Sequence, residues 1–255
     1  MKFYSFLEPA VNILRGRGGS IRQRFFYMPI ERIKLEAFRL TGGSWIEFYG
    51  KKLDGYASIN IEETPSEKYL SKGQEHFDFL IRYGLKPDHR VLDYGCGVLR
   101  TARYLIPYLD YGNYIGMEIS KKRIQKGHQV LSKAGISRED YVVHIASDCL
   151  LKELGNKTFD IIWANSVLTH MPESDIRELL INLKSHLNTD GKFFFTYSPS
   201  ERINSNKPKQ EKIKDFYYPT PYLKSIFEGY GYSFEVLPDG HAQALESPTV
   251  LANLL

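Results

Sequence analysis

Apolar runs alternate with amphipathic stretches from about residue 89 onward. Runs rich in Val, Ile, Phe and Tyr predict buried strands, and apolar residues repeated at helical spacing predict the helices between them. The predicted strands are 89–95, 113–119, 141–148, 159–167 and 191–198, and the predicted helices are 98–109, 121–135 and 173–187. Because strands that alternate with helices form parallel sheets covered on both faces, the pattern predicts a doubly wound α/β sheet.

The pattern continues on both sides of this region. Thr64, Pro65 and Glu67 form a predicted capping box, in which the Thr64 hydroxyl accepts from the backbone of Glu67, so a helix is expected over 65–83. Its predicted core-facing residues are Leu70, Phe77, Leu80 and Ile81. Near the C-terminal end the sequence predicts a helix over 221–230 and two strands within 232–237 and 247–255.

The first 64 residues lie outside this alternation and carry most of the net charge. Residues 1–52 contain ten Lys and Arg against four Glu, whereas the rest of the chain has 24 basic and 26 acidic residues. One amphipathic helix is predicted here, from Pro29 to a stop at Gly42 and Gly43. Its expected apolar face consists of Ile30, Ile33 and Phe38. Residues 1–64 are therefore predicted to be a basic N-terminal extension or arm, where an anionic partner is expected to bind.

The remainder, residues 65–255, is predicted to form one domain. Within it, the connection 201–220 is charged, contains prolines and is too long for a turn. Loops of this length inside compact domains are typically lids or binding loops. We therefore expect 201–220 to be a lid or substrate loop.

Composition restricts the class of protein further. The 255 residues are 42% hydrophobic and 25% charged, as in globular proteins. Cys96 and Cys149 have no metal-ligand spacing, so no metal site is predicted and a reducing compartment is expected. Glu8 and Pro9 interrupt the first apolar residues, and no run of about 18 apolar residues occurs. We expect a cytoplasmic protein, with peripheral contact to a membrane as the alternative.

The sequence VLDYGCG, residues 91–97, ends the first predicted strand of the alternating region. Gly95 and Gly97 can adopt backbone angles closed to other residues and let a ligand approach the main chain. The following helix N-terminus suits an anionic group. A dinucleotide fingerprint would have a third glycine at position 100, where this chain has Arg100. Arg100 therefore disfavours a nicotinamide-dependent oxidoreductase and suits a ligand carboxylate.

Two acidic residues end the next two predicted strands. Glu118 follows Asp93 by 25 residues, and a carboxylate at this place accepts hydrogen bonds from ribose hydroxyls. Asp148 ends the third strand of the region, where its carboxylate can accept a hydrogen bond from the exocyclic amine of adenine. A carboxylate, a ribose and an adenine together describe one molecule.

These residues in this order resemble a class I S-adenosylmethionine-dependent methyltransferase. The resemblance rests on residues 91–97, Glu118, Asp148 and the strand-four sequence FDIIWANS, and it covers roughly residues 65–255. It implies a Rossmann-like, seven-stranded sheet whose last strand runs antiparallel. It also implies S-adenosylmethionine as the cofactor, with the glycine turn beside the methionine part.

The resemblance assigns cofactor contacts to particular residues. The segment 69–73 is similar to one that closes over the cofactor in bacterial members of the small-molecule-modifying kind, which implicates Tyr69 and Gly73. The predicted cofactor-binding residues are Asp93, Gly95, Cys96, Gly97, Arg100, Glu118, Ile119, Asp148, Asn165, Tyr69 and Gly73.

Methyl transfer from a sulfonium requires alignment of the nucleophile and, for a hydroxyl, removal of its proton. His170 follows the fourth strand of the region, where the acceptor enters, and imidazole titrates near neutrality. We therefore predict transfer to a small-molecule, sugar or lipid-linked acceptor, at oxygen, with His170 as general base. A role for His170 in lining the cofactor pocket stays open, and His241 is a second candidate base.

Other classes of function also stay open at this stage. The chain could be a scaffold that binds the cofactor without turnover, or, less favoured, an NAD-dependent oxidoreductase. For the basic arm the alternatives are a cover over the domain, a homodimer contact or an anionic membrane surface. Nucleic acid is the least favoured partner.

Overall fold

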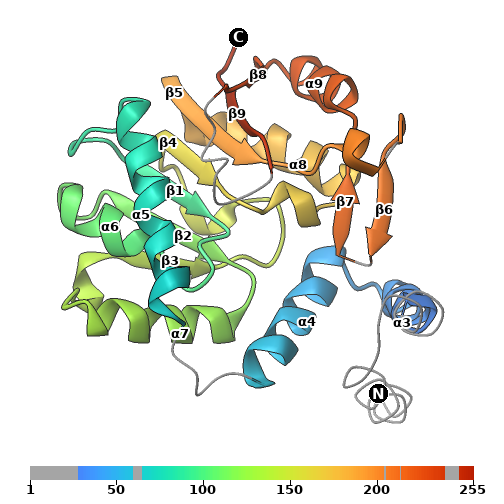
Figure 1. Cartoon of the computed structure of the whole chain (residues 1–255), viewed down its shortest axis with the longest axis horizontal. Coiled ribbons are helices and arrows are strands. Elements are labelled where there is room, and N and C mark those ends of the chain that lie inside the picture. Colours follow the sequence, from blue (N-terminus) through green and yellow to red (C-terminus); the bar gives the residue numbers. More distant parts are fainter. Residues whose placement is uncertain (1–27, 60–64, 204, 213, 239–246) are drawn as a thin grey trace.

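The computed structural model describes residues 28–59, 65–203, 205–212, 214–238 and 247–255. A seven-stranded sheet in the order β3-β2-β1-β4-β5-β9-β8 forms the centre of the molecule (Figure 1). Its strands are β1 (Val91–Tyr94), β2 (Tyr114–Glu118), β3 (Val142–Ile145), β4 (Phe159–Ala164), β5 (Leu187–Thr196), β8 (Glu235–Val236) and β9 (Thr249–Ala252). All of the predicted strands are therefore present, although several are shorter than the apolar runs.

Strand directions confirm the predicted fold class. β1 pairs in parallel with β2 and β4, and parallel pairing continues outward to β3 and β5. β9 runs antiparallel to β5, with Phe194 opposite Leu251, and β8 runs antiparallel to β9. The sheet is thus the mixed, seven-stranded, Rossmann-like sheet with its last strand antiparallel that the resemblance implied.

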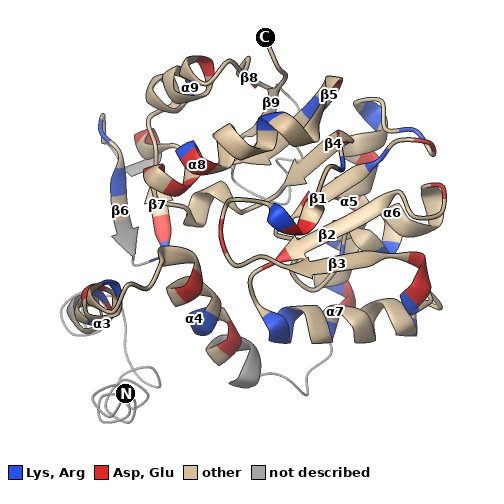
Figure 2. Cartoon of the chain, turned by 180° about the vertical axis from the view of Figure 1, so that it is seen from behind, with Lys and Arg blue, Asp and Glu red and all other residues tan. Residues whose placement is uncertain are grey.

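Helices cover both faces of the sheet, as the alternation predicted. α5 (Glu67–Arg82), α6 (Ala102–Tyr108) and α7 (Lys121–Lys133) contribute to one apolar cluster, which includes Phe79 and Leu105. α8 (Glu173–Leu183) and α9 (Thr220–Gly229) contribute to the other, which includes Leu180 and Phe227. Figure 2 shows that charged residues lie mainly on helices and loops, while the middle of the sheet is largely uncharged. Burial of both faces explains why the central strands are nearly continuous apolar runs, as in β1 and β2.

The start of α5 corrects one local prediction. The N-cap is Ser66, whose side chain accepts from the Tyr69 amide, whereas Thr64 lies outside the described residues. Among the predicted core residues Leu70 and Leu80 are buried, but Ile81 is 36% exposed, and Phe79 takes the core position instead. Successive residues of a helix point about 100° apart, so Ile81 turns away once Leu80 faces the sheet.

The segment 201–220 contains more regular structure than predicted. A 3₁₀ turn (Ser200–Ile203) is followed by β6 (Lys209–Lys212) and β7 (Asp215–Tyr217), which pair in antiparallel fashion as a separate two-stranded sheet. This hairpin was not predicted, and the role of the segment as a lid or substrate loop stays a prediction. α9 begins at Thr220, one residue before the predicted start.

The N-terminal region contains two helices, α3 (Met28–Leu40) and α4 (Trp45–Ile59). α3 confirms the predicted helix, but Ile33 is 63% exposed and Leu35 is buried in its place. α4 was not predicted, although Ser44 and Glu47 form the reciprocal backbone bonds of a capping box. Arg22, Arg24 and the rest of the predicted arm up to residue 27 lie outside the described residues, as does His241.

Charges in the described part of the extension are largely paired. Lys34 and Lys52 both contact Glu31, and Arg39 pairs with Glu36. No helix among the described residues is long and apolar enough to cross a membrane.

Candidate active site

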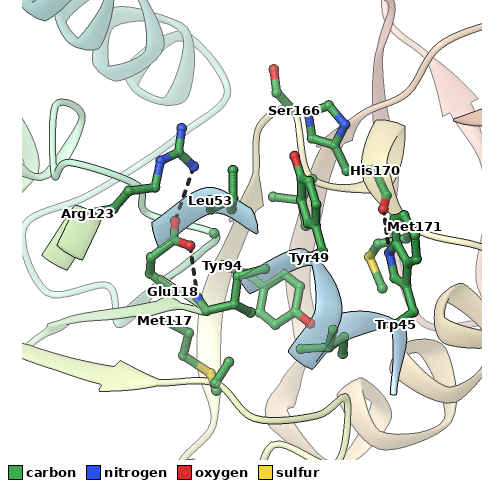
Figure 3. Close-up of a pocket in the computed structure, with 15 residues that line it drawn as sticks. Trp45, Tyr49, Leu53, Tyr94, Met117, Glu118, Arg123, Ser166, His170 and Met171 are labelled. Atoms are coloured by element: carbon green, nitrogen blue, oxygen red, sulfur yellow. Dashed lines mark hydrogen bonds and ion pairs between the residues drawn. The ribbon is translucent and has the colours of Figure 1, made fainter. Parts of the chain in front are cut away.

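A pocket lies at the carboxyl ends of the parallel strands, where doubly wound sheets bind ligands (Figure 3). It is lined from the strand ends, from the turn after β4, from the first turn of α7 and from α4. Gly95, Glu118, Ile119 and His170 are among the lining residues. The structure therefore brings four of the predicted site residues into one cavity.

The glycine turn follows β1 directly. Gly95 and Gly97 have φ angles of 79° and 59°, in the left-handed region that favours glycine. The amides of Gly95 and Cys96 both donate to the carbonyl oxygen of Met117, at 2.7 and 3.0 Å. A Cβ at Gly95 would overlap the side chain of Val167, so the main chain here lies directly against the turn after β4.

Glu118 lies at one end of the pocket and is only 3% exposed. Its Oε1 accepts the amides of Ile119 and Ser120 at 2.9 and 3.0 Å, and its Oε2 accepts the Gly97 amide at 2.9 Å. A carboxylate has about four lone-pair sites, so one site on Oε2 is left for a further donor. This geometry fits a ligand hydroxyl.

Arg123 lies beside Glu118 and was not predicted. Its Nη1 is 3.6 Å from Oε2 of Glu118, and it also lines the pocket. It comes from the first turn of α7, and its place three residues after the N-cap Ser120 is the only sequence signal for it. The two charged groups therefore neutralise each other within the cavity.

His170 faces the other end of the pocket, in the 3₁₀ turn Leu168–His170. Its Nδ1 lies 2.7 Å from the carbonyl oxygen of Lys214. Because a carbonyl can only accept, Nδ1 carries the hydrogen and the neutral ring has its lone pair on Nε2. Burial lowers the pKa of His170 below its usual value, which favours the neutral ring, and Asp215 Oδ1 lies 3.7 Å from Nδ1.

Ser166 occupies the turn after β4 in a strained conformation. Its φ is 57°, which is uncommon for a residue other than glycine, and its amide donates to Thr196 Oγ1 at 2.7 Å. Such strain is concentrated at functional sites. Ser166 lines the pocket, whereas the predicted Asn165 is not among the lining residues and accepts from Thr196 Oγ1 at 3.5 Å.

Several other predicted residues support the pocket without lining it. The Asp93 carboxylate is buried and accepts from the Tyr114 hydroxyl at 3.0 Å; burial raises the pKa of Asp93 to about 7. Cys96 is a buried thiol, and Gly97 acts through its bond to Glu118. The Asp148 carboxylate accepts the Leu150 amide at 2.8 Å, within its own turn. The cofactor roles of these residues stay predictions.

Tyr69, Gly73 and Arg100 form a separate group next to the glycine turn. The Arg100 guanidinium lies 4.7 Å from the centre of the Tyr69 ring. A Cβ at Gly73 would overlap the Arg100 carbonyl, so α5 approaches the chain closely at this point. The structure therefore brings these three residues together, although none of them is among the pocket-lining residues.

The α4 helix supplies one wall of the pocket, and this contribution was not predicted. Trp45, Ile46, Tyr49 and Leu53 line the cavity from this helix. Their spacing of one, three and four residues places them on one helical face. The extension and the predicted domain thus share this site.

Comparisons with known proteins find a methyltransferase domain within this chain. The family model described as "Methyltransferase domain" matches residues 92–193, which include the glycine turn and Glu118. The resemblance to class I S-adenosylmethionine-dependent methyltransferases is therefore confirmed by the family match and by the fold.

Individual relatives are distant. An uncharacterized methyltransferase, YcgJ of Bacillus subtilis, is 24% identical over 148 residues, covering 57% of this chain and 56% of that protein. A sterol 24-C-methyltransferase of Aspergillus fumigatus is 22% identical, covering 51% of this chain and 34% of that protein. The match thus spans about half, or less, of the length of these relatives.

Solved structures show the same fold. The magnesium protoporphyrin IX methyltransferase of Synechocystis, solved with bound SAH, is 17% identical with a TM-score of 0.53, covering 72% of this chain and 82% of that chain. The CcbJ methyltransferase of Streptomyces caelestis is 11% identical with a TM-score of 0.58, covering 78% and 96%.

Proposed function

We propose that this protein transfers a methyl group from S-adenosylmethionine to the hydroxyl oxygen of a small-molecule, sugar or lipid-linked acceptor. One observation supports this most: a single pocket contains the Gly95 turn and Glu118 at one end and His170 at the other. The first end suits a nucleoside, and the second suits an acceptor that loses a proton. The relatives named above act on different acceptors, so they do not indicate which acceptor this chain uses.

The residues present fit the cofactor. Glu118 has one acceptor site left on Oε2 for a ribose hydroxyl, and the Gly95 turn offers main chain without a side chain. Arg100 and Asp148 are proposed to contact the carboxylate and the adenine amine when the ligand binds. When bound, S-adenosylmethionine supplies an electrophilic methyl group.

Side chains of the protein itself are proposed to remove the proton from the acceptor. His170, neutral and with its lone pair on Nε2, takes the proton of the acceptor hydroxyl. The Lys214 carbonyl fixes the ring, and the nearby Asp215 carboxylate stabilises the imidazolium that forms. The α4 residues that line the pocket cover one side of the reacting atoms.

Cofactor binding is tested by titration calorimetry with S-adenosylmethionine, S-adenosylhomocysteine and NAD. We expect both sulfur compounds to bind the wild type and NAD not to bind. Glu118→Gln keeps the size of the side chain but loses the charge, so binding should weaken about tenfold or more. Glu228→Gln, on the half-exposed end of α9, is the matched control and should bind as the wild type does.

No binding of either sulfur compound to folded wild-type protein would refute the proposed function. Binding without methyl transfer to any hydroxyl acceptor would favour a silent scaffold. For residues 1–27 the homodimer and the anionic membrane surface stay predictions, to be tested by sedimentation alone and with anionic vesicles.

A further inference from the structure

The α4 helix is attached at both ends of the pocket. Near its start, Trp45 Nε1 donates to the carbonyl oxygen of His170 at 2.9 Å. Near its end, Asp54 Oδ1 accepts from the Ser120 hydroxyl at 2.6 Å and from the Lys122 amide at 3.2 Å. One helix therefore joins the segment of the proposed base to the turn that follows Glu118.

Tyr49 lies midway between these attachments. Its ring stacks on Trp45, with centroids 5.7 Å apart and planes inclined by 8°, and lies 5.4 Å from the His170 ring at 46°. Gly50 permits this placement, because a Cβ there would meet the Ile119 carbonyl oxygen at 3.2 Å. Figure 3 shows the Tyr49 hydroxyl directed toward His170 and Ser166.

The hydroxyl of Tyr49 and the imidazole of His170 have complementary hydrogen-bonding roles. Burial raises the pKa of Tyr49 above its usual value, so the phenol keeps its proton and serves as a donor. Among the described residues nothing accepts from this hydroxyl. His170 Nε2, in contrast, is an acceptor. An alcohol or phenol oxygen can accept from Tyr49 and donate to His170, whereas an ether lacks the hydrogen and an ammonium lacks the lone pair.

The surroundings of these two groups are apolar and flat. Trp45, Tyr49 and Met171 line this end of the pocket, and Phe216 packs edge-on against Trp45 at 5.3 Å. The charged residues that line the cavity, Glu118 and Arg123, pair with each other at 3.6 Å. An ionised acceptor would therefore find little compensation here, and a flat ring would fit the aromatic wall.

We propose that Tyr49 positions the acceptor, and that the acceptor is a neutral hydroxyl on a flat, largely apolar ring, such as a phenol. This inference rests on the proposed function. The acceptor oxygen bonds to the methyl carbon while the carbon–sulfur bond breaks and its electron pair stays on sulfur. The hydroxyl proton passes to His170 Nε2, so the positive charge of the sulfonium ends on the imidazolium.

The experiment uses the full chain saturated with S-adenosylhomocysteine and three probes: 4-methylphenol, 4-methylanisole and cyclohexanol. Binding is measured by ligand-observed NMR titration. Wild type should bind 4-methylphenol about tenfold more tightly than either other probe, because one lacks the hydrogen and the other lacks the flat ring. Tyr49→Phe should lose about the same factor for the phenol and should keep its affinity for S-adenosylhomocysteine.

A matched control removes a phenol oxygen elsewhere. Tyr111 is 79% exposed, and Tyr111→Phe should bind all probes as the wild type does. Methyl transfer to 4-methylphenol should show a raised KM in Tyr49→Phe with an unchanged pH midpoint, because His170 is intact. A purely structural role would weaken cofactor binding instead.

Three results would overturn the inference. They are equal phenol affinity in Tyr49→Phe and wild type, equal affinity of the wild type for the phenol and the anisole, and no phenol binding to a complex that holds S-adenosylhomocysteine. The comparison of the three probes uses only the wild type, so it tests the inference even if Tyr49→Phe does not fold. Failure to bind S-adenosylhomocysteine would refute the proposed function rather than this inference.

Discussion

Replacement of Gly95 by alanine should cost stability through two separable effects. The first is backbone strain, since φ is 79° and an L-residue in the left-handed region loses about 1–2 kcal/mol. The second is overlap, since the new Cβ would lie closer than 3.0 Å to Cγ2 of Val167, a separation that real Cβ atoms essentially never show. Overpacking of this kind costs about 1–3 kcal/mol, so Gly95→Ala should lose ~2–5 kcal/mol of unfolding free energy.

Further variants separate the backbone strain from the side-chain overlap. Gly135 has nearly the same φ of 78°, but a Cβ there meets nothing within 4 Å, so Gly135→Ala should show only the strain. Val167→Ala removes the atom that overlaps, so the double variant Gly95→Ala/Val167→Ala should be more stable than the sum of the single changes predicts. The coupling free energy should equal the overlap cost, about 1–3 kcal/mol.

The assay is urea unfolding of the four variants and wild type without ligand, followed by circular dichroism. Equal slopes across the series are required for the comparison. Additivity within about 0.3–0.5 kcal/mol would refute the reasoning, because it would mean that Val167 does not contact residue 95 in the folded protein. A cost in Gly135→Ala as large as in Gly95→Ala would refute the assignment to overlap.

Three other variants test the buried groups. Burial raises the pKa of Asp93 to about 7, so the folded protein favours the protonated carboxyl, and the unfolding free energy should fall as pH rises from about 4 through 7. Asp93→Asn should show a smaller difference between pH 5 and pH 8 in urea unfolding than the wild type does. Burial lowers the pKa of His170, so the chemical shifts of its ring protons should change with a midpoint below pH 6.5 in an NMR titration. His170→Asn assigns the signal, because the variant lacks it. A midpoint above pH 6.5 would contradict a neutral imidazole base. The Cβ of Gly73→Ala would overlap the Arg100 carbonyl, which is main chain and cannot be removed. About 1–3 kcal/mol of unfolding free energy should therefore be lost in urea unfolding, and a neutral result would contradict the close packing of α5.

Most of the fold was predictable from the sequence because its determinants are local. Strands buried on both faces need apolar residues at nearly every position, as in residues 159–164, and helices need the 3.6-residue repeat. The turn at Gly95 and Gly97 could be predicted because positive φ angles select glycine. Glu118 could be predicted because the carboxyl ends of parallel strands meet at one edge of the sheet.

The structural predictions were wrong where a contact between residues distant in sequence decides the local structure. In the α5 helix Phe79 rather than Ile81 reaches the core, because the face toward the sheet is fixed by packing and not by the helix alone. The segment 201–220 forms a hairpin, and β7 places Phe216 against Trp45, a residue about 170 positions earlier. Propensity within a window carries no information about such a partner.

The sequence by itself determined the doubly wound sheet, the glycine turn, the acid at the end of β2 and the class of protein they define. Only the tertiary structure decided which side chains share the pocket: Tyr49 from the N-terminal extension, Arg123 from α7 and His170 after β4. The reason is physical. Local periodicity fixes how each element forms, but the bond from Trp45 to His170 joins residues 125 positions apart and exists only once the elements have packed together.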